Sequence, residues 1–441
     1  MTVATTTVIT FQTTVMRHFK IILTVILISC SFFKSNASQI LVPMDAENQE
    51  NHLKAYGIAY WVLDQQIHIY WLLNYRGGSF LIPHSPQIEK EFIIRGVSYE
   101  MIDEGSAGAI LAEIASPSKN MEAVKLEVAP KMAVYSPKTA LPWDDAVTMV
   151  LSYAEIPYDI IYDEEVLRGD LSKYNWLHLH HEDFTGQYGK FYAAYRDAAW
   201  YMQQKKEYEA DAHRLGFNKV SEAKLAVAKE IQRYVLGGGF LFAMCSATDS
   251  YEIALAAQNV VICESMFDGD PADANAQNGL DFSKSFAFQN YQLITNPLRY
   301  EYSTIDVTEK HYAAFQNKEE EDYFELFEFS AKWDVIPTML CQNHTRYVKG
   351  FMGQTTAFFK EFIKPNVLIL GEMESFDEAR YIHGEAGKGF FTFYGGHDPE
   401  DYQHRVGDPP TDLNLHPNSP GYRLILNNVL FPAAKKKPQK T

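Results

Sequence analysis

Cysteine, positive charge and long apolar runs are all scarce in this 441-residue chain. Four cysteines are too few for a scaffold held together by disulfides. The 39 Lys and Arg residues against 56 Asp and Glu give a net charge of -17, which excludes a general nucleic-acid binder. Beyond the N-terminal region no stretch reaches the roughly 18 apolar residues of a membrane-spanning helix. The 46% of hydrophobic residues are nevertheless enough for a large globular core.

The N-terminal region has the three zones of a secretory signal. A basic start at residues 16–20 precedes an apolar run at 21–28 and a small-residue end at 35–37. Cleavage after Ala37 fits the small-x-small rule, and a lipobox at 27–30 that would lipidate Cys30 is the open alternative. We therefore expect an exported protein of the periplasm or envelope, which would touch a membrane only through such a lipid anchor.

Apolar runs alternate with helical periodicity along the rest of the chain. This order predicts an α/β protein in which helices flank a flavodoxin-like parallel sheet, with an N-terminal α/β segment and a long cap insertion. Residues 117–120, which are polar and helix-breaking, are expected to be a linker. The expected units are residues 1–37, upstream residues and signal peptide; 38–128, the N-terminal α/β domain; 129–433, the main domain with insertions at 186–217 and 265–345; and 434–441, a basic tail.

The clearest motif is GGGFLFAMCSAT at residues 237–248, where an apolar strand, a turn of small residues and a helical stretch follow one another. This order is typical of a nucleophile elbow, which presents one side chain at the tip of a strand. Cys245 would be the nucleophile, favoured as thiolate by the helix N-terminus. The backbone N–H of Ser246 would be an oxyanion donor. A small buried hydrophobe is the alternative interpretation of Cys245.

A candidate base lies in the segment YGGHDPE at residues 394–400, directly after a later expected strand. His397 would accept the proton of Cys245, and Asp398 or Glu400 would orient its ring. The alternative is a structural histidine that bonds the loop backbone.

Residues 143–180, the elbow at Cys245 and the ending at 387–398 resemble the class I glutamine amidotransferase-like superfamily. A β-hairpin is expected from two apolar runs, 380–382 and 390–394, around a turn at 384–389. This hairpin and the GGHD sequence after it, at 395–398, are most similar to the ThuA-like branch. Over its whole length, including HLKAYGIAYWVL from His52, the chain is similar to an exported Bacteroidota family often labelled asparagine synthetase B. The resemblance implies a flavodoxin-like domain with Cys245 as nucleophile and His397 as catalytic histidine.

The chain departs from the amidotransferase pattern around both of these residues. Ala243 and Ala247 replace the glycines that usually flank the nucleophile, and the usual His-Pro-Glu is stretched to residues 397–400. The segment 246–250 lacks both glycines of an ATP-cradling Ser-Gly-Gly-x-Asp-Ser loop. Glutamine-hydrolysing asparagine synthesis is therefore the weaker alternative.

A third cluster of polar residues stands at the end of one expected strand. Its members are His178, His180, His181, Glu182 and Asp183. His178 and His180 share a face of the strand, and its carboxyl end is where parallel sheets bind ligands. His181, Glu182 and Asp183 are expected to line the pocket. With His397 or His404, His178 and His180 are candidate zinc ligands, the alternative being a polar strand end; no other cofactor is expected.

Together these features predict an exported hydrolase that attacks an amide or ester carbon of a small molecule or glycan through Cys245 and His397. One alternative is a non-catalytic envelope protein that binds a glycan or a partner on a ThuA-like scaffold. Another is metal-dependent chemistry around His180 and Glu182. Thiol reactivity separates the first two, because a catalytic thiol must be accessible and ionised near neutral pH.

Overall fold

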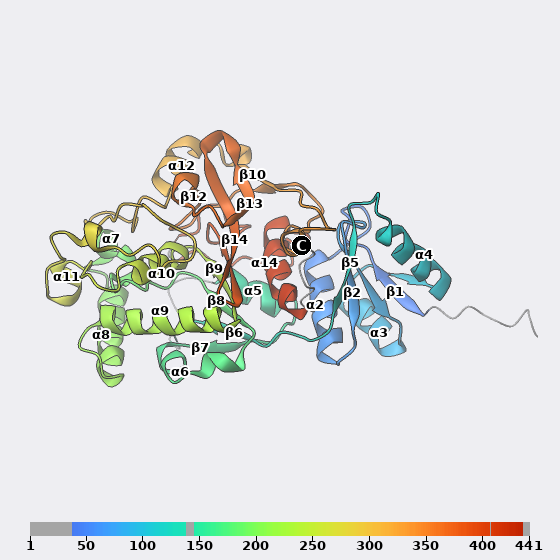
Figure 1. The fold of residues 1–441 in the computed structure, drawn as a ribbon, viewed down its shortest axis with the longest axis horizontal. Helices are drawn as coiled ribbons and strands as arrows, with labels where there is room; N and C mark the ends of the chain where they lie inside the picture. The colour runs from blue at the N-terminus through green and yellow to red at the C-terminus, as the bar shows by residue number, and fades with distance from the viewer. Residues whose placement is uncertain (1–37, 138–144, 406, 435–441) are drawn as a thin grey trace, which may run out of the picture.

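The computed structural model describes residues 38–137, 145–405 and 407–434. The predicted export signal, with Cys30, and the tail from residue 435 lie outside these ranges. In the described ranges, none of the helices combines the length and the apolar character needed to span a bilayer. The chain is mixed α/β, with a smaller five-stranded sheet and a larger ten-stranded sheet along its long axis (Figure 1).

The smaller sheet is antiparallel throughout, in the order β4-β1-β3-β2-β5. Its strands are β1 (Gln39–Val42), β2 (Ile69–Leu73), β3 (Ser79–Pro83), β4 (Glu100–Ile102) and β5 (Glu122–Leu126). Its helices are α2 (His52–Asp64), α3 (Pro86–Arg95) and α4 (Glu104–Ala115). Because β5 pairs along β2, residues 117–120 connect α4 to β5 inside this unit, and the linker predicted there is wrong.

One half of the larger sheet consists of five parallel strands in the order β7-β6-β8-β9-β15. They are β6 (Met132–Tyr135), β7 (Asp159–Ile161), β8 (Trp176–Leu179), β9 (Phe240–Met244) and β15 (Gly389–Tyr394). Every residue of β6, β8 and β9 is buried, as expected for parallel strands covered on both faces.

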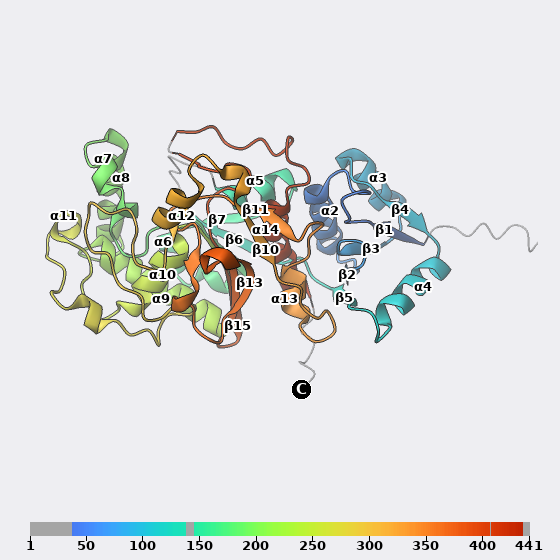
Figure 2. The same ribbon diagram turned by 90° about the horizontal axis from the view of Figure 1, so that it is seen from above.

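Helices cover both faces of this half. The helices α5 (Ala146–Tyr153) and α14 (Pro420–Leu430) share one hydrophobic core with α2 of the smaller unit. The opposite face carries α6 (Asp163–Leu167), α9 (Val220–Gly237) and α10 (Ala247–Ala256) in a second core. Figure 2 shows α9 and α10 together on the side away from the N-terminal unit.

The other half of the larger sheet is antiparallel. It contains β10 (Tyr323–Leu326), β11 (Tyr347–Lys349), β12 (Phe358–Phe359), β13 (Leu368–Met373) and β14 (Glu378–Ala386). The predicted hairpin before His397 is confirmed, since β14 pairs with β15. The segment 265–345 is not wholly a cap, because β10 pairs with β13 inside the sheet.

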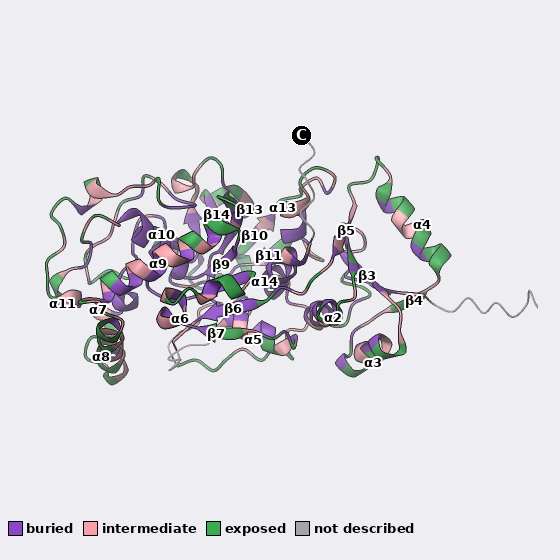
Figure 3. Cartoon of the chain, turned by 60° about the horizontal axis from the view of Figure 1, so that its bottom comes forward, coloured by how far each residue is buried: buried purple, intermediate pink, exposed green. Residues whose placement is uncertain are grey.

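The remaining helices lie outside the sheets. They are α7 (Tyr192–Tyr195), α8 (Ala199–Arg214), α11 (Ser265–Asp268), α12 (Thr308–Phe315) and α13 (Val335–Leu340). Short 3-10 turns occupy Asp170–Lys173, Tyr188–Lys190, Ala276–Gly279, Glu319–Glu321, Lys360–Phe362, Glu374–Phe376 and Phe431–Ala433. The segment 186–217, predicted as a helical arm, contains α7 and α8, and in α8 only Tyr201 and Ala212 are buried (Figure 3).

Candidate functional site at the carboxyl edge of the parallel strands

Three neighbouring parallel strands bring the predicted residues to one edge of the sheet. His180 follows β8, Cys245 follows β9, and His397 follows β15 by three residues. Because β9 pairs with both β8 and β15, the ends of these strands are adjacent. Ligand sites of open α/β sheets form at this edge.

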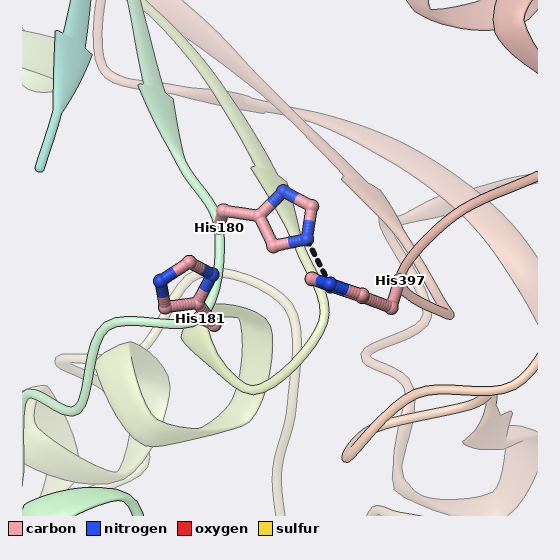
Figure 4. Close-up of side chains that lie close together, drawn as sticks. All are labelled: His180, His181 and His397. Atoms are coloured by element: carbon pink, nitrogen blue, oxygen red, sulfur yellow. Dashed lines mark hydrogen bonds between the residues drawn. The ribbon is translucent and has the colours of Figure 1, made fainter. Parts of the chain in front are cut away.

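His180, His181 and His397 form a compact cluster (Figure 4). The side-chain nitrogens that they offer all lie within 4.8 Å of one another. A hydrogen bond of 2.5 Å joins Nε2 of His180 to Nδ1 of His397. His180 and His397 are buried, and His181 is half-buried. These three imidazoles form a group that could hold a metal ion.

A carboxylate on the other side of His180 completes the arrangement. Asp145 Oδ1 lies 3.3 Å from His180 Nδ1, and Asp145 Oδ2 lies 3.2 Å from His178 Nε2. Asp145 is also the N-cap of α5, where its Oδ1 accepts from the backbone N–H groups of Val147 and Thr148. Sequence reasoning missed Asp145, although an Asp before an apolar helical run is a recognisable cap signal.

The environment keeps the three imidazoles neutral. Burial lowers the pKa of His180, although the charge of Asp145 opposes this effect. Burial, and after it the charge of His180, holds the pKa values of His181 and His397 well below the usual value. A neutral imidazole keeps the lone pair that a metal ion requires.

His404 lies beside this cluster. Its ring centroid is 4.5 Å from that of His397, and its Nδ1 is hydrogen-bonded to Asp401 Oδ2 at 2.8 Å. Its Nε2 is buried and has no hydrogen-bond partner among the described residues. Two further groups of described residues could hold a metal ion: Asp145 with His178 and His180, and Asp401 with His404 and the exposed Asp408.

Cys245 has the strained backbone of an elbow, with φ at +50°, between β9 and α10. Backbone N–H groups of Gln354, Ser246 and Thr355 donate hydrogen bonds to its sulfur, but burial outweighs them and raises the pKa of the thiol to about 11. In the described ranges no hydrogen bond joins Cys245 to His397, whose partner is His180. The structure therefore places the predicted nucleophile and base on neighbouring strand ends without pairing them.

The residues expected to assist Cys245 and His397 have other partners. Asp398 accepts hydrogen bonds from the hydroxyls of Tyr422 and Thr411, each at 2.7 Å. Glu400 Oε2 lies 3.0 Å from His416 Nδ1. The Ser246 N–H, expected to serve an oxyanion, is directed at the sulfur of Cys245.

Glu182 and Asp183 directly follow His181 of the cluster. Asp183 is used within its own loop, where it accepts from Thr185 N at 2.7 Å and from Gly189 N at 3.1 Å. Glu182 is buried, and burial raises its pKa to about 8 although the charge of Lys224 lowers it. His178 is fully buried, and its Nδ1 is 3.1 Å from the carbonyl oxygen of Phe242.

No family model and no curated protein matches the chain. Two solved cytoplasmic proteins of Salmonella typhimurium are similar to part of the chain. The first shares 10% identity, and the match covers 70% of this chain and 100% of that protein with a TM-score of 0.33. The second shares 12% identity, and the match covers 69% of this chain and 100% of that protein with a TM-score of 0.34. The GH42 β-galactosidase Gan42B shares 12% identity, with 61% of this chain and 28% of its own covered and a TM-score of 0.26. These scores assign neither a fold family nor an activity, and the amidotransferase-like resemblance stays a prediction.

Proposed function

We propose that this protein is a zinc-dependent hydrolase of amide or ester bonds, with its metal bound by His180, His181 and His397. The observation that carries the proposal is the convergence of three neutral imidazoles within 4.8 Å at the carboxyl edge of the sheet. His180, His181 and His397 would be three protein ligands, and zinc bound by three ligands would supply an activated water for attack on a carbonyl carbon.

The orientation of His180 supports this assignment. Its Nδ1 faces the carboxylate of Asp145 and its Nε2 faces His397. A carboxylate behind a histidine fixes the tautomer whose other nitrogen bears the lone pair, as in carboxylate–histidine–zinc arrangements. Ligand nitrogens around a tetrahedral zinc lie roughly 3.3 Å apart, so His180 and His397 need to separate by only about 1 Å.

The scaffold also supports the proposal. The five parallel strands, numbered in chain order, lie in the order second, first, third, fourth, fifth. This is the flavodoxin order, and we infer a flavodoxin-like main domain of the amidotransferase-like class. With the export signal predicted at residues 16–37, the substrate would be a small molecule or glycan outside the cytoplasm.

A second candidate is hydrolysis by Cys245 itself. The positive φ of Cys245 and the three N–H groups around its sulfur favour it, because a strained elbow is the usual support of a nucleophile. A thiol whose pKa is near 11, and to which no described residue is hydrogen-bonded as a base, is however a weak nucleophile at neutral pH. We therefore give the metal-dependent reaction precedence.

The test is the metal content and the esterase activity of the full chain. The proposal predicts about one tightly bound zinc per chain and hydrolysis of p-nitrophenyl acetate that stops on chelation and returns with zinc. His397→Ala should lower zinc affinity at least about tenfold, whereas His213→Ala, a matched change on the exposed part of α8, should not. Equal zinc binding by the wild type and His397→Ala would overturn the proposal.

A further inference from the structure

Two buried aspartates beside the Cys245 elbow are held in the same manner. Asp249 lies in the first turn of α10, and its Oδ1 accepts a hydrogen bond of 3.0 Å from Thr355 Oγ1. Asp306 precedes α12, and its Oδ1 accepts from Thr308 N at 2.8 Å and from Thr308 Oγ1 at 2.6 Å. In each case one carboxylate oxygen is fixed by a threonine hydroxyl.

The second oxygen of each carboxylate takes no part in these contacts with threonine. Oδ2 of Asp249 and Oδ2 of Asp306 are buried and have no hydrogen-bond partner among the described residues. Asp249 is 0% exposed and Asp306 is 7% exposed. Buried polar groups in proteins are almost always hydrogen-bonded, so such a pair of acceptors marks a place where a donor binds.

The same short segment, residues 355–356, is linked by hydrogen bonds to both aspartates. Thr355 bonds Asp249, and the next residue, Thr356, bonds Thr308 through a 3.0 Å contact between their hydroxyl oxygens. Burial and then the charge of Asp249 raise the pKa of Asp306 well above its usual value, and burial raises the pKa of Asp249 to about 7, so a bound cation would favour the ionised form of both carboxyls.

A further buried group also lacks a partner. The hydroxyl of Tyr302 makes no hydrogen bond among the described residues, and this residue is 2% exposed. Burial, and after it the charges of Asp183 and Asp249, raises the pKa of Tyr302 well above its usual value. The nearby ammonium of Lys190 is already bonded to the carbonyls of Ile294 and Asn296.

We infer that Asp249 and Asp306 form a binding site for the ammonium group of a small organic amine, next to the Cys245 elbow. An ammonium group offers three N–H donors and the positive charge that two buried carboxylates require. The aromatic ring of Tyr302 suits an organic cation. In the described ranges neither aspartate belongs to a group of three possible metal ligands, which favours an ammonium group over a metal ion.

This site uses other residues than the histidine cluster and does not rest on the proposed zinc chemistry. The segment of Gln354 and Thr355 directs its N–H groups at Cys245 and its threonine hydroxyl at Asp249. An amine bound there would place the rest of its molecule beside the elbow. The ligand class is therefore a compact primary amine, of which an amino-acid amide is the simplest probe.

The test compares two probes that differ only in the charged group. Glycinamide carries an ammonium group near pH 7, and glycolamide carries a hydroxyl in its place. Calorimetric titration of the full chain should show glycinamide binding about tenfold more tightly than glycolamide. Asp249→Asn and Asp306→Asn should each reduce this preference below about threefold.

Three controls make the result decisive. The Asn variants keep the Oδ1 atom that accepts from the threonine hydroxyl. The preference is the ratio of the two probe affinities measured on the same folded sample, so a change in stability does not alter this ratio. Asp270→Asn, which removes the same charge from an exposed position, should keep the full preference. Equal affinity for the two probes, no glycinamide binding at millimolar concentration, or an unchanged preference in both variants would overturn the inference.

Discussion

At the scale of single residues, one carboxylate organises the histidine cluster. Asp145 contacts His178 and His180 with its two oxygens and caps α5 with the same carboxylate. The hydrogen-bonding partner of a ligating histidine sets its tautomer and tunes metal affinity. The capping and electrostatic roles of Asp145 can be separated, because capping needs only one acceptor oxygen.

Asp145→Asn should separate these roles. Asn caps helices about as well as Asp, so we expect a change of less than about 0.5 kcal/mol in the free energy of unfolding. Loss of the negative charge behind His180 should lower zinc affinity about 10- to 100-fold. A chelator competition titration and urea unfolding measure the two quantities. Unchanged zinc affinity in this variant would contradict the metal-tuning role and show that Asp145 acts only as a cap.

The reactivity of Cys245 is a second prediction at this scale. Burial raises its pKa to about 11, so carbamidomethylation by iodoacetamide, followed by mass spectrometry, should stay slow at neutral pH and rise only in strongly alkaline buffer. Cys263 is an internal control, since it is buried and donates to the carbonyl of Thr185. Rapid labelling of Cys245 with a midpoint below about pH 8 would instead favour the cysteine nucleophile.

The sequence predicts most of the histidine cluster but not its contacts. His180, His181 and His397 are found because polar residues after apolar strands mark the edge of a parallel sheet. The contact of His180 with His397 and Asp145 depends on strand order and on the packing of α5, which no local pattern contains. The same reason explains why Cys245 and His397 were expected to pair: adjacency of their strands does not determine which neighbour a ring contacts.

At the scale of elements, buried strands with clear boundaries are the easiest to predict. The run at 240–244 is β9, and the small residues after it give the expected turn into α10. Strands β10 and β11 were not expected, because they are short, lie at the antiparallel edge and contain exposed residues. Side-chain hydrogen bonds hold part of the segment 265–345 to α10, and those of Glu252 are the clearest case.

Glu252 fixes the segment 286–288 to α10. Its two carboxylate oxygens accept hydrogen bonds from the backbone N–H groups of Phe286, Ala287 and Phe288 at 2.9, 2.7 and 3.1 Å. Glu252→Gln replaces one of these acceptors by a donor, and we expect a loss of about 2 kcal/mol in the free energy of unfolding. Urea unfolding measures it, and Glu309→Gln, at an exposed site, should cost less than about 0.5 kcal/mol. Equal losses in the two variants would contradict this account.

At the scale of the whole molecule, α14 joins the two sheets. Arg423 on α14 is fully buried, and it donates to the carbonyl oxygen of Met44 at 3.0 Å and to the hydroxyl of Tyr56 at 3.2 Å. His52 and His344 stack beside it with their ring centroids 4.2 Å apart. Burial and the positive guanidinium of Arg423 favour the neutral form of both the buried His52 and the half-buried His344.

This junction should make stability depend on pH. Burial and the charge of Arg423 lower the pKa of His52 from 6.5 to about 4, although its acceptor partners Asn418 and Met44 favour the protonated ring. Between these values the unfolded chain binds a proton that the folded chain does not, so stability is full above about pH 6.5 and falls as pH drops toward 4. The contribution of His52 to this fall is about 3 kcal/mol.

The pH dependence is measured by urea unfolding at a series of pH values. His52→Gln removes the titrating ring, and the variant should lose correspondingly less stability between neutral pH and pH 4. Other groups titrate in both proteins, so the difference between them isolates His52. An identical pH dependence in the two proteins would contradict the account of the junction.

The central claim is the metal centre, and X-ray absorption at the zinc edge of the full chain, loaded with one equivalent of zinc, tests it most directly. The account predicts a nitrogen or oxygen shell at about 2.0–2.1 Å with the scattering pattern of three imidazoles, and fewer imidazoles in His397→Ala. A sulfur shell at about 2.3 Å, which would place the metal on a cysteine, or the same spectrum in the variant would contradict it.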